Sequence, residues 1–413
     1  MKYETIVIGA GQAGLATSYY LAQYGEEHVV LEQSSQVASG WRNRSWDSLT
    51  LVTPNLAFRM PGAELRGDRD GFMPLRDILS FFEDYVRKSR LPILYNIKVL
   101  SVSGADDGSY ALETSDGMYS AKNVVIATGF FQHPKLPTYS KTISSAIKQM
   151  HSSEYRRPAS VADGAVLVVG SGQSGTQIVE ELLKAGRKVF LCVGTAGRAP
   201  RRYRGKDIIE WLHIVGLFDL TSEQLPPGMG KFDGIPHLSG TNGGHTINLH
   251  QFARDGVTLL GHMRFAENDK ILLAPDLHTS LEAIDSFEVN ATQMIDEYIL
   301  NNSLDAPEEI LPQLKFGYDQ PLIKELSLSG EGINTIVWAM GYIFDYSMVK
   351  LPVVDHDGFP IQSAGVTKYP GLYFVGMPWM PSEKSGFLLG VGDSAHFIVN
   401  HIVRSGSKKS VEK

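Results

Sequence analysis

Short apolar runs, glycine-rich turns and amphipathic stretches follow one another in a repeating order along the chain. Near the N-terminus the apolar run in "YETIVIG" enters the turn "GAGQAG". A stretch of about three helical turns follows, closed by Gly25, and then the apolar run "HVVLE". Apolar runs of this length between turns predict buried strands, and the amphipathic stretch predicts a helix that stops at the glycine. Residues 3–32 are therefore predicted to form a strand, a turn, a helix and a second strand.

The same order returns in the middle of the chain. Placing "GSGQSGTQIVEELLKAGRKVFLCVGT" over "GAGQAGLATSYYLAQYGEEHVVLEQS" aligns the three loop glycines without a gap. The overlay also matches Gln12 with Gln173, Leu21 with Leu182 and Gly25 with Gly186. The chain therefore carries two copies of one unit, 161 residues apart.

Each copy has the spacing Gly-x-Gly-x-x-Gly between a strand and a helix, which is the context of a dinucleotide-binding loop. The first glycine makes the tight turn, the second lets the backbone approach a pyrophosphate, and the third lets the helix pack closely on the strand. The helix N-terminus adds amide donors and a positive dipole. We predict two dinucleotide-binding loops, formed by Gly9, Gly11 and Gly14 and by Gly170, Gly172 and Gly175.

The two copies differ where the second strand ends. Glu32 stands 18 residues after Gly14, and a carboxylate there accepts hydrogen bonds from a ribose diol. The equivalent position of the second copy is Val193, and the arginine-rich segment "GTAGRAPRRYRGK" follows it. A guanidinium can bind a ribose 2′-phosphate that a carboxylate would repel. We predict an adenine dinucleotide with a free ribose at the first loop and NADPH at the second, with Arg198 and Arg201 favoured over Arg202 and Arg204.

The rest of the chain predicts an α/β fold with two Rossmann-like dinucleotide-binding domains, the NADPH domain inserted into the first domain. Residues 91–129 read as hairpins, and "HPKLPTYS" reads as a proline-stiffened linker. The last seventy residues predict a strand, "GLYFVG", and a helix that return to the first domain. The predicted boundaries are 1–160, 161–335 and 336–413. Within 205–330 an amphipathic helix is expected at 280–302, and the tail 404–413 is expected to be frayed.

Composition narrows the classes of function. A net charge of −7 disfavours nucleic acid as the main partner, and the chain has no apolar run of about 18 residues that would span a membrane. The single cysteine, Cys192, excludes a disulfide framework, a Cys-x-x-Cys pair and a cysteine-ligated zinc. The N-terminus leaves no room for a signal peptide, so a cytoplasmic protein is expected, with a homodimer as the prior for its assembly.

Three histidines, His237, His245 and His250, lie in "IPHLSGTNGGHTINLH" without carboxylates at ligand spacing. We therefore predict no metal site and expect these histidines near the nicotinamide or the substrate.

Several of these stretches resemble the flavin-dependent monooxygenases of the two-dinucleotide type, which include the flavin-containing monooxygenases, the plant YUCCA enzymes and the Baeyer–Villiger enzymes. "VIGAGQAG" with Glu32 is similar to their FAD fingerprint, "VVGSGQSG" to their NADPH fingerprint, and "VVIATGFFQHPKLP" to their linker. "GWRNRSWDSLTLVTPN", "IVWAMGY" and "SGFLLGVGDSA" resemble their flavin-facing and crossover segments. The resemblance implies FAD and NADPH as cofactors. The further cofactor-binding residues that it implies are Gln12, Ala13, Gln33, Trp41, Val99, Thr128, Gly129, Gln173, Ser174, Gly376, Phe387 and Leu388.

The resemblance also implies two catalytic residues. Asn55 is similar to an asparagine beside the flavin in heteroatom-oxidising members, although an Asn in a Pro-Asn turn is also an ordinary structural residue. "SAIKQMHSSEY" keeps His151 and Tyr155 of the family hallmark, but Ser145 and Ile147 replace its Phe and Gly. The alternative for His151 is a structural histidine at the domain junction.

Such an enzyme passes hydride from NADPH to the flavin, which then forms a hydroperoxide with dioxygen, so no protein nucleophile is required. The predicted function is insertion of one oxygen atom into a small molecule, at a nitrogen or sulfur centre or oxidatively on a 2-oxo acid. Two alternatives stay open. One is an NADPH-dependent reductase or oxidase that delivers electrons to another acceptor, and the other is a flavoprotein sensor that turns over nothing.

Overall fold

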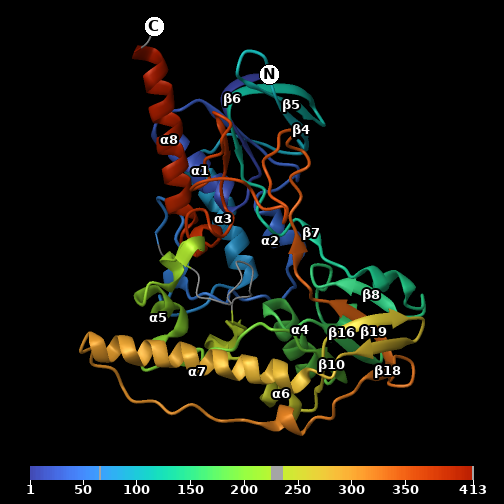
Figure 1. Cartoon of the computed structure of the whole chain (residues 1–413). Coiled ribbons are helices and arrows are strands. Elements are labelled where there is room, and N and C mark those ends of the chain that lie inside the picture. Colours follow the sequence, from blue (N-terminus) through green and yellow to red (C-terminus); the bar gives the residue numbers. More distant parts are fainter. Residues whose placement is uncertain (65–66, 225–235, 412–413) are drawn as a thin grey trace.

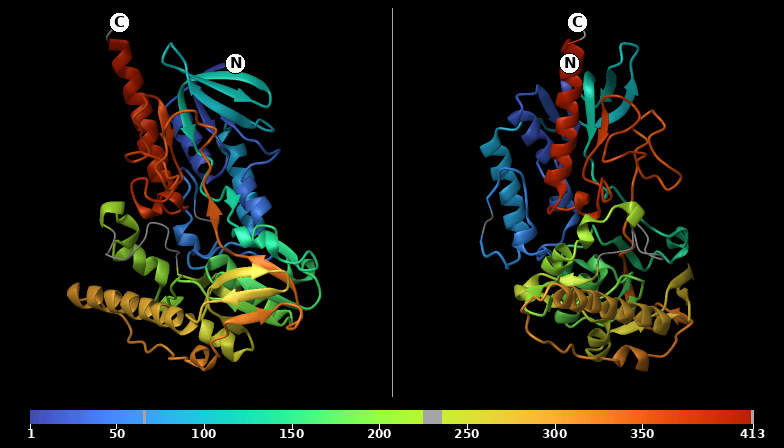
Figure 2. Two further views of the ribbon diagram at one scale, coloured as in Figure 1. Left: turned by 45° about the vertical axis from the view of Figure 1, so that its right-hand side comes forward. Right: turned by 60° about the vertical axis from the view of Figure 1, so that its left-hand side comes forward.

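The chain forms two α/β bodies, one above the other in Figure 1, each built on its own largely parallel sheet. The computed structural model describes residues 1–64, 67–224 and 236–411. The N- and C-terminal ends both lie at the top of the upper body, and the long helix α7 (Leu277–Asn301) crosses the bottom of the lower one (Figures 1 and 2).

The upper sheet has the strand order β3-β2-β1-β6-β5-β4, and β21 pairs with the second half of β6. Strands β1, β2, β3, β6 and β21 are parallel, whereas the β4–β5 hairpin is antiparallel to the first half of β6. The bounds are β1 (Lys2–Ile8), β2 (His28–Leu31), β3 (Ile93–Leu94), β4 (Val99–Gly104), β5 (Tyr110–Thr114), β6 (Gly117–Ile126) and β21 (Leu372–Phe374).

Helices and a hairpin cover the two faces of the upper sheet. One face packs against α1 (Gln12–Gln23), α3 (Leu75–Ser89) and α8 (Val391–Val411), and α2 (Ser39–Arg44) lies beside α3. The other face packs against the β4–β5 hairpin and residues 344–359. Side chains alternate between the faces as a strand requires: Val7 belongs to the first core, and Ile6 and Ile8 belong to the second.

The lower sheet is entirely parallel, with the strand order β15-β10-β9-β19-β8. Its strands are β8 (Lys148–His151), β9 (Ala165–Val169), β10 (Val189–Cys192), β15 (Thr258–Leu260) and β19 (Ile333–Trp338). One face packs against α4 (Gln173–Lys184), α6 (Leu249–Arg254) and the first half of α7. The other face packs against a small antiparallel sheet of β16 (Met263–Glu267), β17 (Lys270–Leu273) and β18 (Glu325–Ser327).

The chain crosses between the two bodies twice, and the crossings lie side by side. β7 (His133–Pro134) of the first crossing pairs antiparallel with β20 (Tyr342–Ile343) of the second. Because β21 then pairs with β6, the second sheet is inserted within the first domain, as predicted. The predicted boundaries at 160 and 335 need correction, because β8 and the whole of β19 pair in the second sheet.

The segment that sequence patterns described least well links the bodies. It contains β11 (Arg202–Tyr203), β12 (Lys206–Asp207), α5 (Ile208–Ile214) and the hairpin of β13 (Leu238–Ser239) with β14 (His245–Thr246). The amphipathic helix expected at 280–302 is confirmed as α7. The tail expected to be frayed is helical as far as Val411, where α8 ends, and residues 412–413 lie outside the described residues. Across the described residues, no helix has the combined length and apolar character needed to cross a bilayer.

Candidate functional site: two dinucleotide-binding loops

The first glycine loop lies at the carboxyl ends of β1, β2 and β6. Gly9 has a φ of +104°, and a Cβ there would lie 2.8 Å from the carbonyl oxygen of Ala127. A Cβ on Gly14 would lie 1.9 Å from the carbonyl oxygen of Gly9. By contrast, a Cβ on Gly11 would meet nothing within 4 Å. Packing within the chain therefore explains Gly9 and Gly14, whereas the bare backbone at Gly11 borders open space that a ligand can approach.

The second loop repeats this geometry at β9, β10 and β19. Gly170 has a φ of +107°, and a Cβ there would lie 2.5 Å from the carbonyl oxygen of Ala339. A Cβ on Gly175 would lie 1.9 Å from the carbonyl oxygen of Gly170, whereas one on Gly172 would meet nothing within 4 Å. The matched pattern shows that the two loops are built alike in space as well as in sequence.

Both loops end at a helix N-terminus without a side-chain cap. Gly11 and Gly172 are the N-cap residues of α1 and α4, and neither cap makes a side-chain hydrogen bond to its helix. The first amides of a helix have no partner within the helix, and the helix dipole favours negative charge there. Each loop therefore presents backbone donors suited to a phosphate.

Glu32 reaches the first loop from the end of β2. It is 3% exposed, and its carboxylate accepts hydrogen bonds from the Ala10 amide at 2.8 Å and from the Ser34 amide at 2.9 Å. In the second loop the buried Val193 stands at this position, and the Ser171 hydroxyl instead accepts a hydrogen bond from the Gly194 amide at 2.9 Å. The second site therefore lacks the carboxylate that distinguishes the first.

The C-terminal segment returns to the first loop. Gln12 Nε2 donates to the carbonyl oxygen of Gly386 at 2.8 Å, and a Cβ on Gly376 would lie 2.4 Å from the Cβ of Ala13. Leu388 belongs to the core under α1 and α8, next to the half-buried Phe387. The matching Gln173 holds the hairpin β13–β14 instead, since it donates to the Leu238 carbonyl and accepts from the Leu238 amide at 3.0 Å.

The other predicted cofactor residues occupy varied surroundings. Thr128 and Gly129 follow β6 next to Gly9, and Gln132 Nε2 donates to both of them, at 3.1 and 2.7 Å. Trp41 packs against the α1 core, and Val99 is buried in the core on the opposite face of the sheet. Gln33 is exposed and Ser174 is half-buried.

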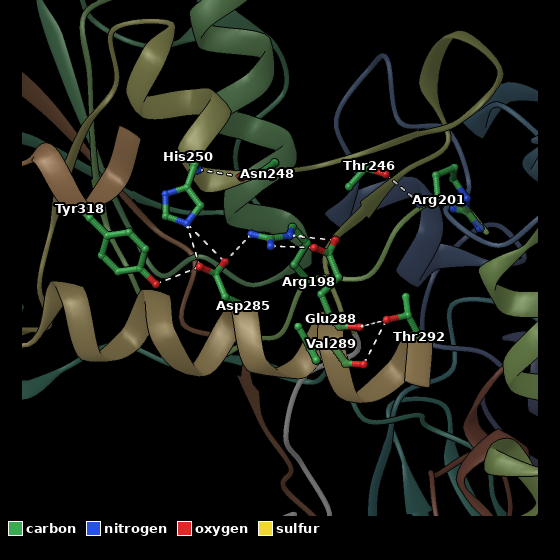
Figure 3. A network of polar contacts seen from close by, with 10 residues as sticks. All are labelled: Arg198, Arg201, Thr246, Asn248, His250, Asp285, Glu288, Val289, Thr292 and Tyr318. Atoms are coloured by element: carbon green, nitrogen blue, oxygen red, sulfur yellow. Dashed lines mark hydrogen bonds and ion pairs between the residues drawn. The ribbon is translucent and has the colours of Figure 1, made fainter. Parts of the chain in front are cut away.

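The two arginines predicted to bind a 2′-phosphate lie in buried ion pairs, and Figure 3 shows the pairs of Arg198. Arg198 Nε and Nη2 donate to the two carboxylate oxygens of Glu288 at 3.0 and 2.8 Å, and Nη1 lies 2.8 Å from Asp285 Oδ1. Arg201 pairs with Asp207, donates to the Val52 carbonyl at 2.7 Å and covers the ring of Phe72. Both guanidinium groups are therefore engaged within the chain, and their binding of a 2′-phosphate stays a prediction.

Sequence reasoning missed these acidic partners because two of them lie far away along the chain. Asp285 and Glu288 come from α7, which Gly197 approaches so closely that a Cβ there would lie 2.4 Å from the ring of Phe287. Of the four arginines in the segment, Arg202 keeps an exposed side chain.

The three histidines of the 237–250 stretch have separate surroundings. His250 is fully buried, bonded to Asp285 at 3.2 Å and to the Gly317 amide at 3.0 Å. His245 Nε2 lies 2.5 Å from Glu180 Oε1. His237 is fully buried, and neither ring nitrogen has a hydrogen-bond partner among the described residues. Burial, and then the charge of Arg198, lower the pKa of His237 to about 3, so its ring is neutral.

His151 ends β8 and has both ring nitrogens occupied. Nε2 lies 3.0 Å from the Gly341 carbonyl and must carry the proton, so Nδ1 accepts from the Ser153 amide at 3.2 Å. Burial lowers the pKa of His151. Gly341 begins the second crossing, so His151 connects the lower sheet to the crossing strands. This is the place expected of a structural histidine at the domain junction.

Asn55 begins a short 3-10 helix, Asn55–Ala57, and is 6% exposed. Its Nδ2 donates to the Asp68 carbonyl at 2.8 Å, and its Oδ1 has no hydrogen-bond partner among the described residues. One N–H of the amide and the carbonyl oxygen are thus uncommitted within the part of the chain that the structure describes.

Two glycine loops at uncapped helix starts, on one largely parallel and one fully parallel sheet, define the class of this protein as an α/β protein with two dinucleotide-binding domains. A family model described as "Pyridine nucleotide-disulphide oxidoreductase" matches residues 6–213. An uncharacterized CzcO-like oxidoreductase of Geobacillus kaustophilus is 32% identical over 402 residues, covering 97% of this chain and 98% of its own length. The chain belongs to this oxidoreductase family.

More distant relatives include monooxygenases, in agreement with the resemblance seen in the sequence. A probable indole-3-pyruvate monooxygenase, YUCCA1 of Arabidopsis thaliana, is 30% identical over 209 residues, which is 50% of each chain. A flavin-containing monooxygenase from Stenotrophomonas maltophilia has the same fold, with a TM-score of 0.68 at 19% identity over 98% of this chain and 99% of its own.

Two further solved structures share the fold. The bacillithiol disulfide reductase Bdr of Staphylococcus aureus has a TM-score of 0.61 at 16% identity over 98% of this chain and 99% of its own. OTEMO in complex with FAD and NADP has a TM-score of 0.58 at 14% identity over 98% of this chain and 86% of its own.

Proposed function

We propose that this protein is a flavin-dependent monooxygenase that holds FAD at the first loop, takes NADPH at the second and transfers one oxygen atom of dioxygen to a small molecule. The observation that carries the proposal is the pair of loops whose central glycines, Gly11 and Gly172, border open space. Two comparisons support the proposal. The chain is similar to YUCCA and flavin-containing monooxygenases, and the OTEMO structure that shares its fold contains FAD and NADP.

The residues around the first loop fit FAD. The bare backbone at Gly11 and the uncapped start of α1 suit a pyrophosphate, and the Glu32 carboxylate is placed to accept hydrogen bonds from the hydroxyls of a ribose diol. The C-terminal segment, tied to the loop through Gln12 and Gly386, would hold the flavin end.

The residues around the second loop fit NADPH because an acidic residue is missing there. Val193 replaces the acidic residue, so no carboxylate at that position repels a 2′-phosphate. Because Arg198 and Arg201 are paired within the chain, the absent acid rather than these arginines supports NADPH.

When bound, the flavin would accept the hydride and activate dioxygen. The chain would orient the flavin and the substrate and exclude water from the site. Asn55 is proposed to offer its uncommitted N–H to an oxygen atom near the flavin, in a site from which water is excluded. His151 is proposed as a positioning residue at the crossing, because both of its ring nitrogens are already bonded. A cytoplasmic location and a homodimer stay predictions of the sequence.

An electron-transfer reductase is the second candidate, since the family description and Bdr both name disulfide chemistry. The cysteine of this chain gives it no support. Cys192 lies in β10 at 2% exposure, and burial raises the pKa of its thiol to about 12. A thiol of this kind is neither accessible nor ionised enough for exchange.

The test reconstitutes the purified protein with FAD and supplies NADPH, labelled dioxygen, and panels of amines, thioethers and 2-oxo acids. A monooxygenase incorporates one labelled atom into product in proportion to NADPH consumed. Rapid NADPH oxidation with hydrogen peroxide as the product throughout would instead indicate an oxidase. Failure of NADPH to reduce the flavin would indicate a non-catalytic flavoprotein.

A further inference from the structure

A cavity of about 230 Å³ lies between α4 of the lower body and the segment after α2, and neither Gly11 nor Gly172 is among its described lining residues. Trp46 and Ser48 line it from the segment that leads to Asn55, and Trp46 packs into the core of the lower sheet. α4 lines it from the lower body, one turn and more beyond the second loop, and Thr241 and Asn242 close it from the hairpin β13–β14. A ligand here would contact both dinucleotide-binding bodies at once.

Gln177, on α4, marks the cavity as a binding site. The residue is 5% exposed and lines the cavity, and no group among the described residues hydrogen-bonds to its side-chain amide. Buried amides in native proteins are almost always hydrogen-bonded, because an unpaired one loses its water without replacement. The side-chain amide of Gln177 is not among the completely buried unpaired atoms of the described residues, so it reaches the space of the cavity, where a polar ligand or ordered water can be its partner.

The charges around the cavity favour a cation. Two neighbouring carboxylates of α4, Glu180 and Glu181, line it together with one cation, Lys184. Glu180 is compensated by Lys184 Nζ at 3.1 Å and by His245. Glu181 is held by neutral donors, the Tyr155 hydroxyl at 2.8 Å and the Ser48 hydroxyl. Burial raises the pKa of Glu181 above its usual range, as expected for a carboxylate without a directly paired cation.

Trp46 adds an aromatic surface to the same cavity, at 7% exposure. Indole is the aromatic side chain that attracts cations most strongly, and it also packs against flat apolar groups. A carboxylate, an unpaired amide and an indole together suit an ammonium group on a small apolar body.

We propose that this cavity binds a small organic ammonium ion, which pairs with Glu181 and Gln177 and packs its apolar part on Trp46. The binding itself is independent of the proposed function. Whether the bound amine is the molecule oxidised or a ligand that holds the two bodies together rests on that function, and the experiment separates the two.

The test measures calorimetric binding to the FAD-loaded protein without NADPH, using benzylamine and its neutral isostere benzyl alcohol. Benzylamine is expected to bind at least about tenfold more tightly than benzyl alcohol, because a hydrogen bond to a charged group is the stronger kind. Glu181→Gln keeps an acceptor for Tyr155 and is expected to lower the affinity for benzylamine to that for the alcohol. Glu297→Gln, an exposed change on α7, serves as the matched control and leaves binding unchanged.

Gln177→Met is the second variant, and it is also expected to weaken benzylamine binding. Far-UV circular dichroism verifies the fold of each variant. Equal affinity for the amine and the alcohol, absence of binding at millimolar amine, or unchanged amine affinity in folded Glu181→Gln would each overturn the proposal. With NADPH added, labelled oxygen in the amine identifies it as substrate. Binding without turnover identifies a bridging ligand and leaves the binding proposal standing even where the monooxygenase proposal fails.

Discussion

Replacing Arg198 with methionine separates a structural role for this arginine from a role in coenzyme binding. The change removes the cation that two carboxylates of α7 share while keeping an unbranched side chain. Glu288 has a side chain that is 8% exposed and would lose both of its guanidinium hydrogen bonds, at 3.0 and 2.8 Å. Asp285 is 29% exposed and keeps its bonds to His250 and Tyr318 (Figure 3).

The expected cost comes mainly from Glu288. Removing one partner of a buried ion pair leaves an uncompensated buried charge, which costs about 3–5 kcal/mol. Water and the remaining bonds screen Asp285, so its share is discounted and the lower figure of about 3 kcal/mol is expected in total. Against a typical stability of about 5–15 kcal/mol, such a loss moves the unfolding midpoint clearly.

The assay is urea unfolding followed by circular dichroism, together with kcat/KM for NADPH and for NADH. Arg198→Met is expected to lower the unfolding midpoint and leave the ratio of the two kcat/KM values unchanged. Arg202→Met replaces the exposed arginine of the same segment and is expected to change the free energy of unfolding by less than about 0.5 kcal/mol. Adding Glu288→Leu to Arg198→Met is expected to recover part of the stability, because the unpaired charge is removed as well.

One result would refute this reasoning. If Arg198→Met unfolds at the wild-type midpoint but loses its preference for NADPH, then Arg198 binds the 2′-phosphate and its pairing with Glu288 is incidental.

Three further predictions concern other parts of the site. Gly172→Ala adds a methyl group in open space, so the protein is expected to fold and stay yellow with FAD while flavin reduction by NADPH slows in stopped-flow traces; Gly175→Ala is expected not to fold, because its Cβ would lie 1.9 Å from a carbonyl oxygen. Burial lowers the pKa of His237 to about 3 against about 6.5 when unfolded, so the unfolded state binds more protons between these values and stability falls as pH drops below about 6.5, by up to about 1.4 kcal/mol per pH unit. Urea unfolding at several pH values is expected to show a smaller slope for His237→Met, and identical slopes would contradict the assignment. Asn55→Ala is expected to keep NADPH oxidation but release more hydrogen peroxide, since the proposed N–H donor is gone; unchanged coupling to product would remove Asn55 from the mechanism.

The amino-acid sequence by itself determined the two dinucleotide-binding loops, the insertion of one domain in the other and the long helix α7. Each of these depends on short-range information. Gly14 is required by a contact within its own strand–turn–helix unit, and the period of apolar residues marks most of α7. Gly9 in addition approaches Ala127, which lies far away along the chain. The duplication made the loop assignment secure, because the same local requirements occur twice.

The tertiary structure alone decided which charged and polar groups are available for chemistry. A run of arginines has the same sequence pattern whether its side chains bind a phosphate or a carboxylate. The partner of Arg198 is Glu288, 90 residues away, so the local pattern does not reveal it. The pairing of β8 in the second sheet and the unpaired amide of Gln177 are likewise set by segments distant in sequence. Local patterns fix backbone conformation because they act over a few residues. The charge state and accessibility of a side chain depend on every element packed around it, and that information exists only in the folded chain.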